Sequence, residues 1–99
     1  MVRFTIIPLA VLATLVPFAI ANNCKTNLRY CGATLLRVGK YQEQIINALR
    51  ARGQSTDGAH IERSLFFCSG GPNGEIEFLE FCGNRCVDGG SGKNDYCYA

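Results

Sequence analysis

The stretch GNRCVDGGSGKNDYC, residues 83 to 97, places glycines ahead of Lys93, a pattern that could bind a phosphate group. A Walker-type loop also needs glycine at position 87 and a hydroxyl residue after the lysine. The chain has Val87 and Asn94 at those positions, and no helical pattern follows. We therefore predict a turn-rich strap between the last two cysteines, in which the glycines permit the turns.

The residues with the clearest chemistry are cysteines, which can form covalent cross-links. An even number of them in a short exported chain is typical of a disulfide framework. A domain of this size buries little apolar surface, and each bridge typically contributes about 2 to 4 kcal/mol to its stability. We assign all six to disulfides: Cys24, Cys31, Cys68, Cys82, Cys86 and Cys97.

A zinc site is the alternative, because only three residues separate Cys82 from Cys86 and the chain has one histidine, His60. Structural zinc sites usually show two close pairs of ligands, and the other four cysteines stand well apart. We expect no metal and no other cofactor. His60 lies in a polar stretch, where we expect an exposed loop or the end of a strand.

The first 21 residues, MVRFTIIPLAVLATLVPFAIA, form an apolar segment with Arg3 near its start and small residues around Ile20. This pattern predicts a secretory signal peptide, residues 1–21, that is cleaved to leave residues 22–99 as a single domain. A membrane anchor is the alternative. The apolar run is shorter than the roughly 20 residues of a spanning helix, and Pro8 and Pro17 interrupt it. We therefore predict a secreted, extracellular protein.

The secondary structure follows from the periodicity of apolar residues. Residues 29–39 and 60–68 are rich in strand-forming side chains, and residues 75–82 alternate apolar and acidic positions. Residues 40–53 carry apolar side chains at helical spacing and end in a glycine, whereas 69–74 is a turn sequence. We predict strand, helix and β-hairpin in that order, with a bulge where the alternation reverses near Leu79.

These elements predict an α+β fold: a small antiparallel or mixed sheet, stapled by disulfides, with one main helix packed on one face. The order strand, helix, strand predicts a parallel crossover between the first two strands. Six cysteines allow 15 pairings. The crossover favours Cys31–Cys82 at one end of the sheet and Cys68–Cys97 at the other, and it leaves Cys24–Cys86.

Catalysis finds little support, and we predict a protein that is not an enzyme. Ser64, Ser69 and Ser91 lack the context of a nucleophilic serine, and His60 is the one candidate base. Glu75, Glu77 and Glu80 could supply a carboxylate pair for glycosidic cleavage, but Glu75 and Glu77 share one face of an exposed strand and the chain is short for a substrate cleft. We therefore interpret them as solvated charges of the strand.

Charge is distributed unevenly along the chain. Residues 22–56 carry a net charge of +5, whereas residues 57–99 carry −4. The basic half could form an interaction surface for an acidic partner, or the two halves could simply pair with one another. The six residues of the possible surface are Lys25, Arg29, Arg37, Lys40, Arg50 and Arg52. Since Arg50 and Arg52 have no aromatic neighbours on their face, we expect no nucleic acid as partner.

Three stretches, YCGATLLRVGKYQEQI, SLFFCSGGPNGEIEF and CGNRCVDGGSGKNDYC, cover most of the predicted mature chain. With them the chain resembles the small secreted cysteine-rich proteins of filamentous fungi that are treated as candidate effectors and virulence factors. It is most similar to the branch related to the virus-encoded killer toxin of smut fungi, and this resemblance implies a killer-toxin-like α/β sandwich. The chain has no Lys/Arg doublet at which such a toxin precursor is cut into two chains.

The resemblance and the composition together predict an effector-like monomer that acts outside the cell by binding. Its partner would be a host or competitor protein or a cell-wall component. Two alternatives stay open: a killer-toxin-like antimicrobial that acts on membrane lipid, and an inhibitor of a hydrolase. Binding is favoured over membrane attack, because the helix has only a short apolar face and that face is needed to pack on the sheet.

Overall fold

The computed structural model describes residues 23–98 of the 99, so the predicted signal peptide lies outside the described residues. Within the described residues, three helices and five short strands form an α+β fold, as predicted, with three disulfides. In chain order they are β1 (Arg29–Cys31), α1 (Gly32–Val38), α2 (Gln42–Ala51), α3 (Gly58–Arg63), β2 (Ser64–Gly70), β3 (Glu75–Phe81), β4 (Cys86–Val87) and β5 (Tyr96–Cys97).

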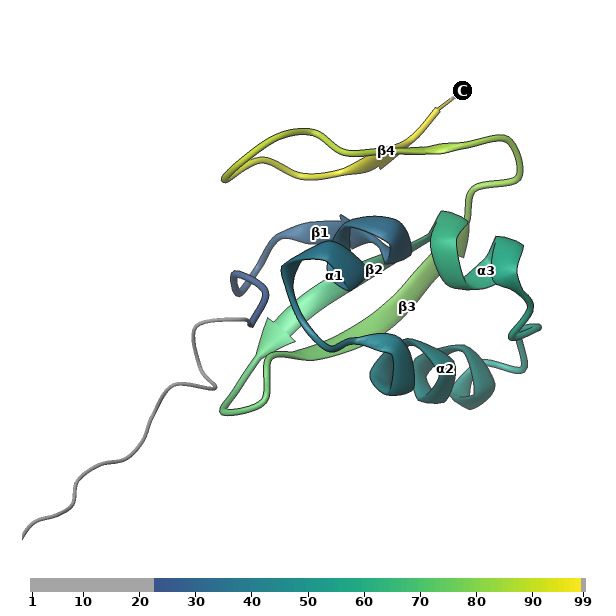
Figure 1. Ribbon diagram of the computed structural model, residues 1–99, viewed down its shortest axis with the longest axis horizontal. Helices are drawn as coiled ribbons and strands as arrows, with labels where there is room; N and C mark the ends of the chain where they lie inside the picture. Colours follow the sequence, from purple (N-terminus) through teal and green to yellow (C-terminus); the bar gives the residue numbers. More distant parts are fainter. Residues whose placement is uncertain (1–22, 99) are drawn as a thin grey trace, which may run out of the picture.

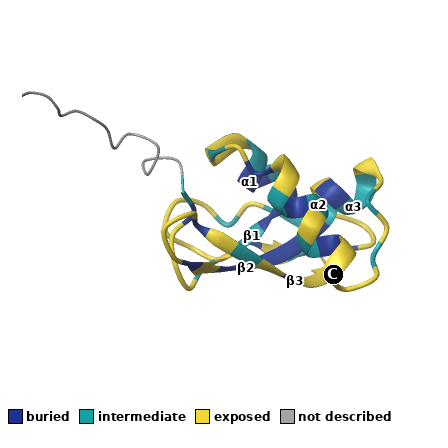
Figure 2. Ribbon diagram, turned by 90° about the horizontal axis from the view of Figure 1, so that it is seen from below, coloured by how far each residue is buried: buried dark blue, intermediate teal, exposed yellow. Residues whose placement is uncertain are grey.

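The molecule consists of a helical layer, a sheet and a C-terminal ribbon. Strands β1, β2 and β3 form one sheet in that order, and all three helices lie on one side of it (Figure 2). The ribbon comprises residues 86–97, in which β4 and β5 pair with each other across a long loop. It runs along the outer edge of β1 (Figure 1).

The sheet is antiparallel throughout, so the predicted parallel crossover is wrong. Strand β1 pairs antiparallel with β2, and β2 with β3. The strand predicted over 29–39 ends at Cys31, because the Gly-Ala-Thr-Leu-Leu sequence that follows forms α1. The strand predicted over 60–68 starts only at Ser64, since Asp57 caps a short helix ahead of it. The three helices carry the chain across one face, and β2 then runs back alongside β1.

Helix α2 confirms the helix predicted over 40–53. Its apolar side chains Ile45 and Leu49 are fully buried. The helix ends in a Schellman motif, in which the N–H of Gly53 donates to the carbonyl of Arg50 and the N–H of Gln54 donates to that of Leu49. Gly53 adopts a φ of 67°, a conformation that glycine reaches without steric cost. The sequence therefore sets the end of this helix locally.

The β2–β3 hairpin and its bulge are also confirmed. Leu65 pairs with Glu80 and Phe66 with Phe78, which leaves Leu79 as the extra residue on β3. The bulge keeps Phe78 under the helices, where its ring meets that of Phe66 edge-on at 6.1 Å between centroids.

The core between helices and sheet is small and includes a disulfide. Tyr41 lies at its margin, 2% exposed, and its hydroxyl donates to the carbonyl of Gly74 and accepts from the N–H of Cys24. Burial raises the pKa of this hydroxyl. Around it the core comprises Cys24, Leu35, Tyr41, Ile45, Leu49, Ile61, Phe66, Cys68 and Phe78.

The disulfides are Cys24–Cys68, Cys31–Cys86 and Cys82–Cys97, so all three predicted pairings are wrong. The error follows from the crossover. With β1 antiparallel to β2, the N–H of Asn27 donates to the carbonyl of Cys68, and the N–H of Cys68 donates to the carbonyl of Leu28. These hydrogen bonds bring Cys24 to the Cys68 end of the sheet. The other two bonds both attach the ribbon, one to β1 and one to the end of β3.

Gly32, the first residue of α1, lies directly against the backbone of α3. A Cβ at this position would overlap the backbone carbonyl of Ile61, which cannot move without shifting α3. The substitution Gly32→Ala should therefore lower the free energy of unfolding by about 2 kcal/mol or more, as measured by urea unfolding with the disulfides intact. Gly58, also the first residue of a helix, has open space around it. Gly58→Ala should be neutral or stabilising by up to about 1 kcal/mol, and equal losses in both variants would contradict this account.

Candidate ligand-binding surface

A buried carboxylate fixes the ribbon beside β1. Asp95, 3% exposed, accepts hydrogen bonds from the N–H groups of Cys31 and Gly89, each at 2.8 Å. Its own N–H donates to the carbonyl of Arg29, while the side-chain oxygen of Asn94 accepts from the N–H of Arg29. Side chains and backbone of the ribbon thus satisfy the backbone hydrogen-bonding groups at the edge of β1, where a further strand would otherwise pair.

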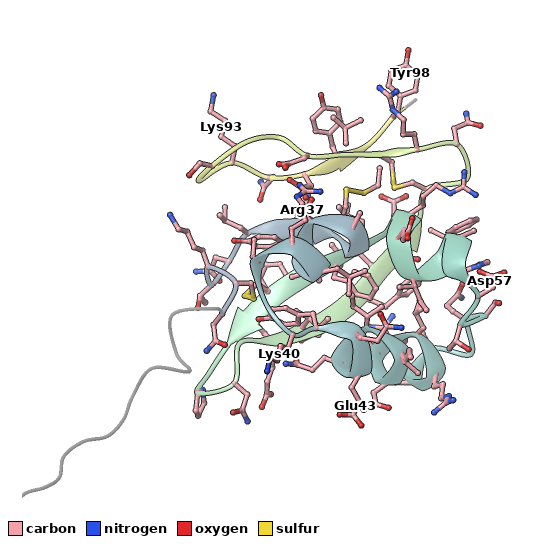
Figure 3. The ribbon with its side chains drawn as sticks, in the orientation of Figure 1. Arg37, Lys40, Glu43, Asp57, Lys93 and Tyr98 are labelled. Carbon is pink, nitrogen blue, oxygen red and sulfur yellow. A yellow bond between two sulfur atoms is a disulfide. The ribbon has the colours of Figure 1, made fainter. Side chains whose placement is uncertain are left out.

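This attachment creates a hollow of about 430 Å³ between α1 and the ribbon loop, which we call the ribbon hollow. Three cations line it: Lys25 from the N-terminal segment, Arg37 from α1 and Lys93 from the loop. Figure 3 shows Arg37 on α1 below the ribbon and Lys93 near the tip of the loop. Asp88 and Asp95 also line the hollow, so cations outnumber carboxylates three to two.

Both carboxylates in the ribbon hollow are already bonded within the protein. Asp95 binds two backbone N–H groups, as described above. Asp88 accepts from the N–H of Gly90 at 2.9 Å and forms an ion pair with Arg37 at 2.6 Å. Within residues 23–98, neither Lys25 nor Lys93 has an ion-pair partner. An anion entering the hollow would therefore meet two ammonium groups that no carboxylate neutralises directly.

The structure does not gather all six residues of the predicted basic surface. Lys25 and Arg37 share the ribbon hollow, whereas Lys40 lines a different cleft. Arg29 lies on β1, and Arg50 and Arg52 lie at the far end of α2. The ion pair Arg37–Asp88 joins the basic half of the chain to the acidic half. For Arg37, therefore, the alternative that the two halves pair with one another is correct.

Sequence reasoning missed Lys93 as part of a basic site, because it belongs to the acidic half of the chain. The available signal was its place in the strap, whose turn-rich character the structure confirms. Both ends of the strap are cross-linked to the body, and the loop between them brings Lys93 to the hollow beside Arg37 of α1.

The second cleft, of about 790 Å³, lies between α2 and the turn of the β2–β3 hairpin. Four of its eleven lining residues carry amide side chains, and the side chain of Gln44 donates across it to the carbonyl of Asn73 at 3.2 Å. Its lining includes one cation, Lys40, and two carboxylates, those of Glu43 and Glu75. The tyrosine hydroxyl at its base, that of Tyr41, is fully used within the protein. The cleft therefore offers no excess of positive charge.

His60 lies in α3, so the prediction of a loop or strand end is wrong. Its ring stacks on Phe81 with 3.9 Å between centroids, and its Nδ1 is 2.8 Å from a carboxylate oxygen of Asp57. The same carboxylate accepts the N–H of His60, which makes Asp57 the N-cap of the helix. Within the described residues no three His, Cys, Asp or Glu side chains gather in a cluster that could hold a metal ion.

No protein-family model, no curated protein and no solved structure matches this chain. Among the helices of the described residues, none is long and apolar enough to cross a membrane. Three disulfides fit a small protein of an oxidising, extracellular compartment.

The cap of α3 should give the protein a pH dependence in the acid range. The backbone and side-chain hydrogen bonds from His60 lower the pKa of Asp57 below its ordinary value of 3.8. A carboxyl group whose pKa is lower in the folded chain stabilises the fold above the unfolded pKa, and that stability is lost as the pH falls through the folded pKa. Wild type should therefore lose thermal stability below about pH 4, measured as a falling midpoint.

The variant Asp57→Ser separates the charge from the cap. Serine still accepts a hydrogen bond at the N-cap but does not titrate, so its midpoint should fall less steeply over the same acid range. Asp57→Ala should lower the midpoint at every pH. The same acid dependence in wild type and Asp57→Ser would contradict this assignment.

Proposed function

We propose that the mature chain is a secreted, non-enzymatic protein that binds an acidic extracellular ligand in the ribbon hollow. The observation that carries the proposal is the pair of lysines, Lys25 and Lys93, held at this hollow without carboxylate partners among the described residues. The ligand chemistry is a carboxylate or phosphate group presented on a polymer, a protein or a lipid headgroup.

Export is supported by two features of the chain. Residues 1–21 have the composition of a signal peptide, and all six cysteines form disulfides. The resemblance of the sequence to the secreted cysteine-rich proteins of fungi, including the killer-toxin-like branch, agrees with an effector-like role at a host or competitor surface.

Binding is favoured over catalysis by the environment of the one histidine. A general base needs a ring nitrogen within reach of a substrate proton, but His60 is stacked on Phe81 and bonded to the capping carboxylate of Asp57. Its side chain is only 21% exposed. The contacts of His60 are therefore structural, and they account for this residue without a catalytic role.

Binding is also favoured over direct attack on a membrane. The apolar face of α2, which a membrane-active helix would insert, packs on the sheet through Ile45 and Leu49. Exposing that face would require the core to open. The hydrolase-inhibitor alternative differs only in the kind of acidic partner.

The test compares two double variants that remove the same amount of charge. Lys25→Ala/Lys93→Ala removes the two unpaired cations of the hollow, and Arg50→Ala/Arg52→Ala removes two from the far end of α2. The probes are polygalacturonate, a soluble polymeric carboxylate, and vesicles of phosphatidylserine and phosphatidylcholine. We expect wild type to bind at least one probe with an affinity that falls with ionic strength.

The lysine variant should bind roughly tenfold more weakly, and the arginine variant as wild type. Binding to the polymer alone would identify a polymer or protein carboxylate as the ligand chemistry, whereas binding to vesicles alone would identify a headgroup. Equal losses in the two variants, or no binding to either probe, would overturn the proposal. Urea unfolding of both variants controls for folding.

A further inference from the structure

The ribbon has two chemically different faces, because side chains on a strand alternate between its sides. Cys86 and Cys97 lie opposite each other on one face, and both are bonded to the body of the protein. The next pair along the strands, Val87 and Tyr96, must lie on the other face. The cysteines thus determine which residues of the ribbon point to solvent.

A second tyrosine extends the outward face. The N–H of Tyr98 donates to the carbonyl of Arg85 at 2.8 Å, so these two residues continue the pairing beyond β4 and β5. The guanidinium of Arg85 lies over the ring of Tyr98, 4.9 Å from its centroid. Figure 3 shows Tyr98 pointing away from the sheet and helices. We call Arg85, Val87, Tyr96 and Tyr98 the tyrosine face.

The tyrosine face is exposed although its rings are large. Tyr96 is 52% exposed and Tyr98 is 56%, and neither belongs to the core clusters. Two neighbouring aromatic rings in water on a cross-linked strand pair offer flat apolar surface with hydroxyl groups at the edge. Because the disulfides already fix the strands, little conformational entropy remains to be lost when a ligand binds.

The size and charge of this face restrict its ligand. A stable protein interface takes about 20 to 30 residues on each side, far more than the four here. One cation lies on the face, Arg85, and it is engaged with Tyr98, so the face has no array that would attract a polyanion. A short stretch of a neutral chain with flat, weakly apolar rings and many hydroxyl groups fits these properties.

We propose that the tyrosine face binds a neutral polysaccharide of the extracellular surroundings, with sugar rings stacked on Tyr96 and Tyr98. These residues are two apart on one strand, which places their attachment points about 6 to 7 Å apart, a separation that lets adjoining sugar units reach both rings. Arg85 holds the ring of Tyr98 in place and presents its remaining N–H groups to sugar hydroxyls. This surface is separate from the ribbon hollow and goes beyond the anion binding proposed for it.

The test measures binding of soluble oligosaccharides by the oxidised protein. The probes are hexamers of β-1,4-linked N-acetylglucosamine, β-1,4-linked glucose and β-1,3-linked glucose, in titration calorimetry at low and at high salt. The chain has four tyrosines and no tryptophan, so quenching of tyrosine fluorescence provides a second signal. We expect at least one hexamer to bind independently of salt and to quench the emission.

Four variants assign the site. Tyr96→Ala/Tyr98→Ala should weaken binding at least tenfold, whereas Tyr96→Phe/Tyr98→Phe should retain most of it, since the rings stay. Arg85→Ala should weaken it by a smaller factor. Lys25→Ala/Lys93→Ala should bind the hexamer as wild type, which separates this site from the ribbon hollow.

Three results of the hexamer titrations would overturn the proposal, and a fourth comes from the vesicles. The three are no binding of any hexamer, equal binding by wild type and Tyr96→Ala/Tyr98→Ala, or loss of binding at high salt. If the tyrosine variants instead weaken binding to the anionic vesicles, the face is part of a lipid-binding surface and the polysaccharide assignment is wrong. A disulfide map and an unfolding midpoint like those of wild type establish that each variant is folded.

Discussion

The attachment of the C-terminal ribbon to the first strand is the constraint on which both candidate surfaces depend. The paired segments of the ribbon are two residues each, too short to persist as an isolated hairpin in water. The bonds Cys31–Cys86 and Cys82–Cys97 hold its two strands to the body, and the carboxylate of Asp95 holds its loop against β1. Without these contacts the loop that carries Lys93 would have no fixed position relative to Lys25 and Arg37.

The three disulfides act on different parts of this arrangement. Cys24–Cys68 lies inside the core and joins the N-terminal segment to the strand that the helices cover. The other two form a second cluster with Leu65, in which sulfur atoms occupy the place that apolar side chains would fill in a larger protein. Cys31–Cys86 closes the longest loop, with a sequence separation of 55, and so restricts the unfolded chain most. The small core and the cross-links therefore stabilise different parts of one domain.

The sequence indicated the elements whose signals are local and failed where the outcome depended on packing. Helix α2 is marked by its periodicity and its terminal glycine, and the bulge at Leu79 by a reversal of alternation. The short helices α1 and α3 have no such mark. The first residue of α1, Gly32, lies against the backbone carbonyl of Ile61 in α3, and that contact is between residues far apart in the chain. Missing α1 and α3 led to a parallel crossover, and the crossover led to three wrong disulfides.

The candidate surfaces were harder to predict than the fold for a related reason. Charge counted along the chain grouped Lys25 and Arg37 with Arg50 and Arg52, although the last two lie at the far end of α2. The same count placed Lys93 in the acidic half, away from the two residues it joins in the ribbon hollow.

In contrast, the outward position of Tyr96 and Tyr98 follows from the sequence DYCYA once the cross-link of Cys97 is known. If Cys97 is cross-linked to the body and the segment is a strand, the residues on either side of it must point to solvent. This exposure of the neighbours holds in the ribbon but not on β1, where Tyr30 beside Cys31 packs against the core. The same reasoning applies to Cys86, whose neighbours Arg85 and Val87 complete the tyrosine face.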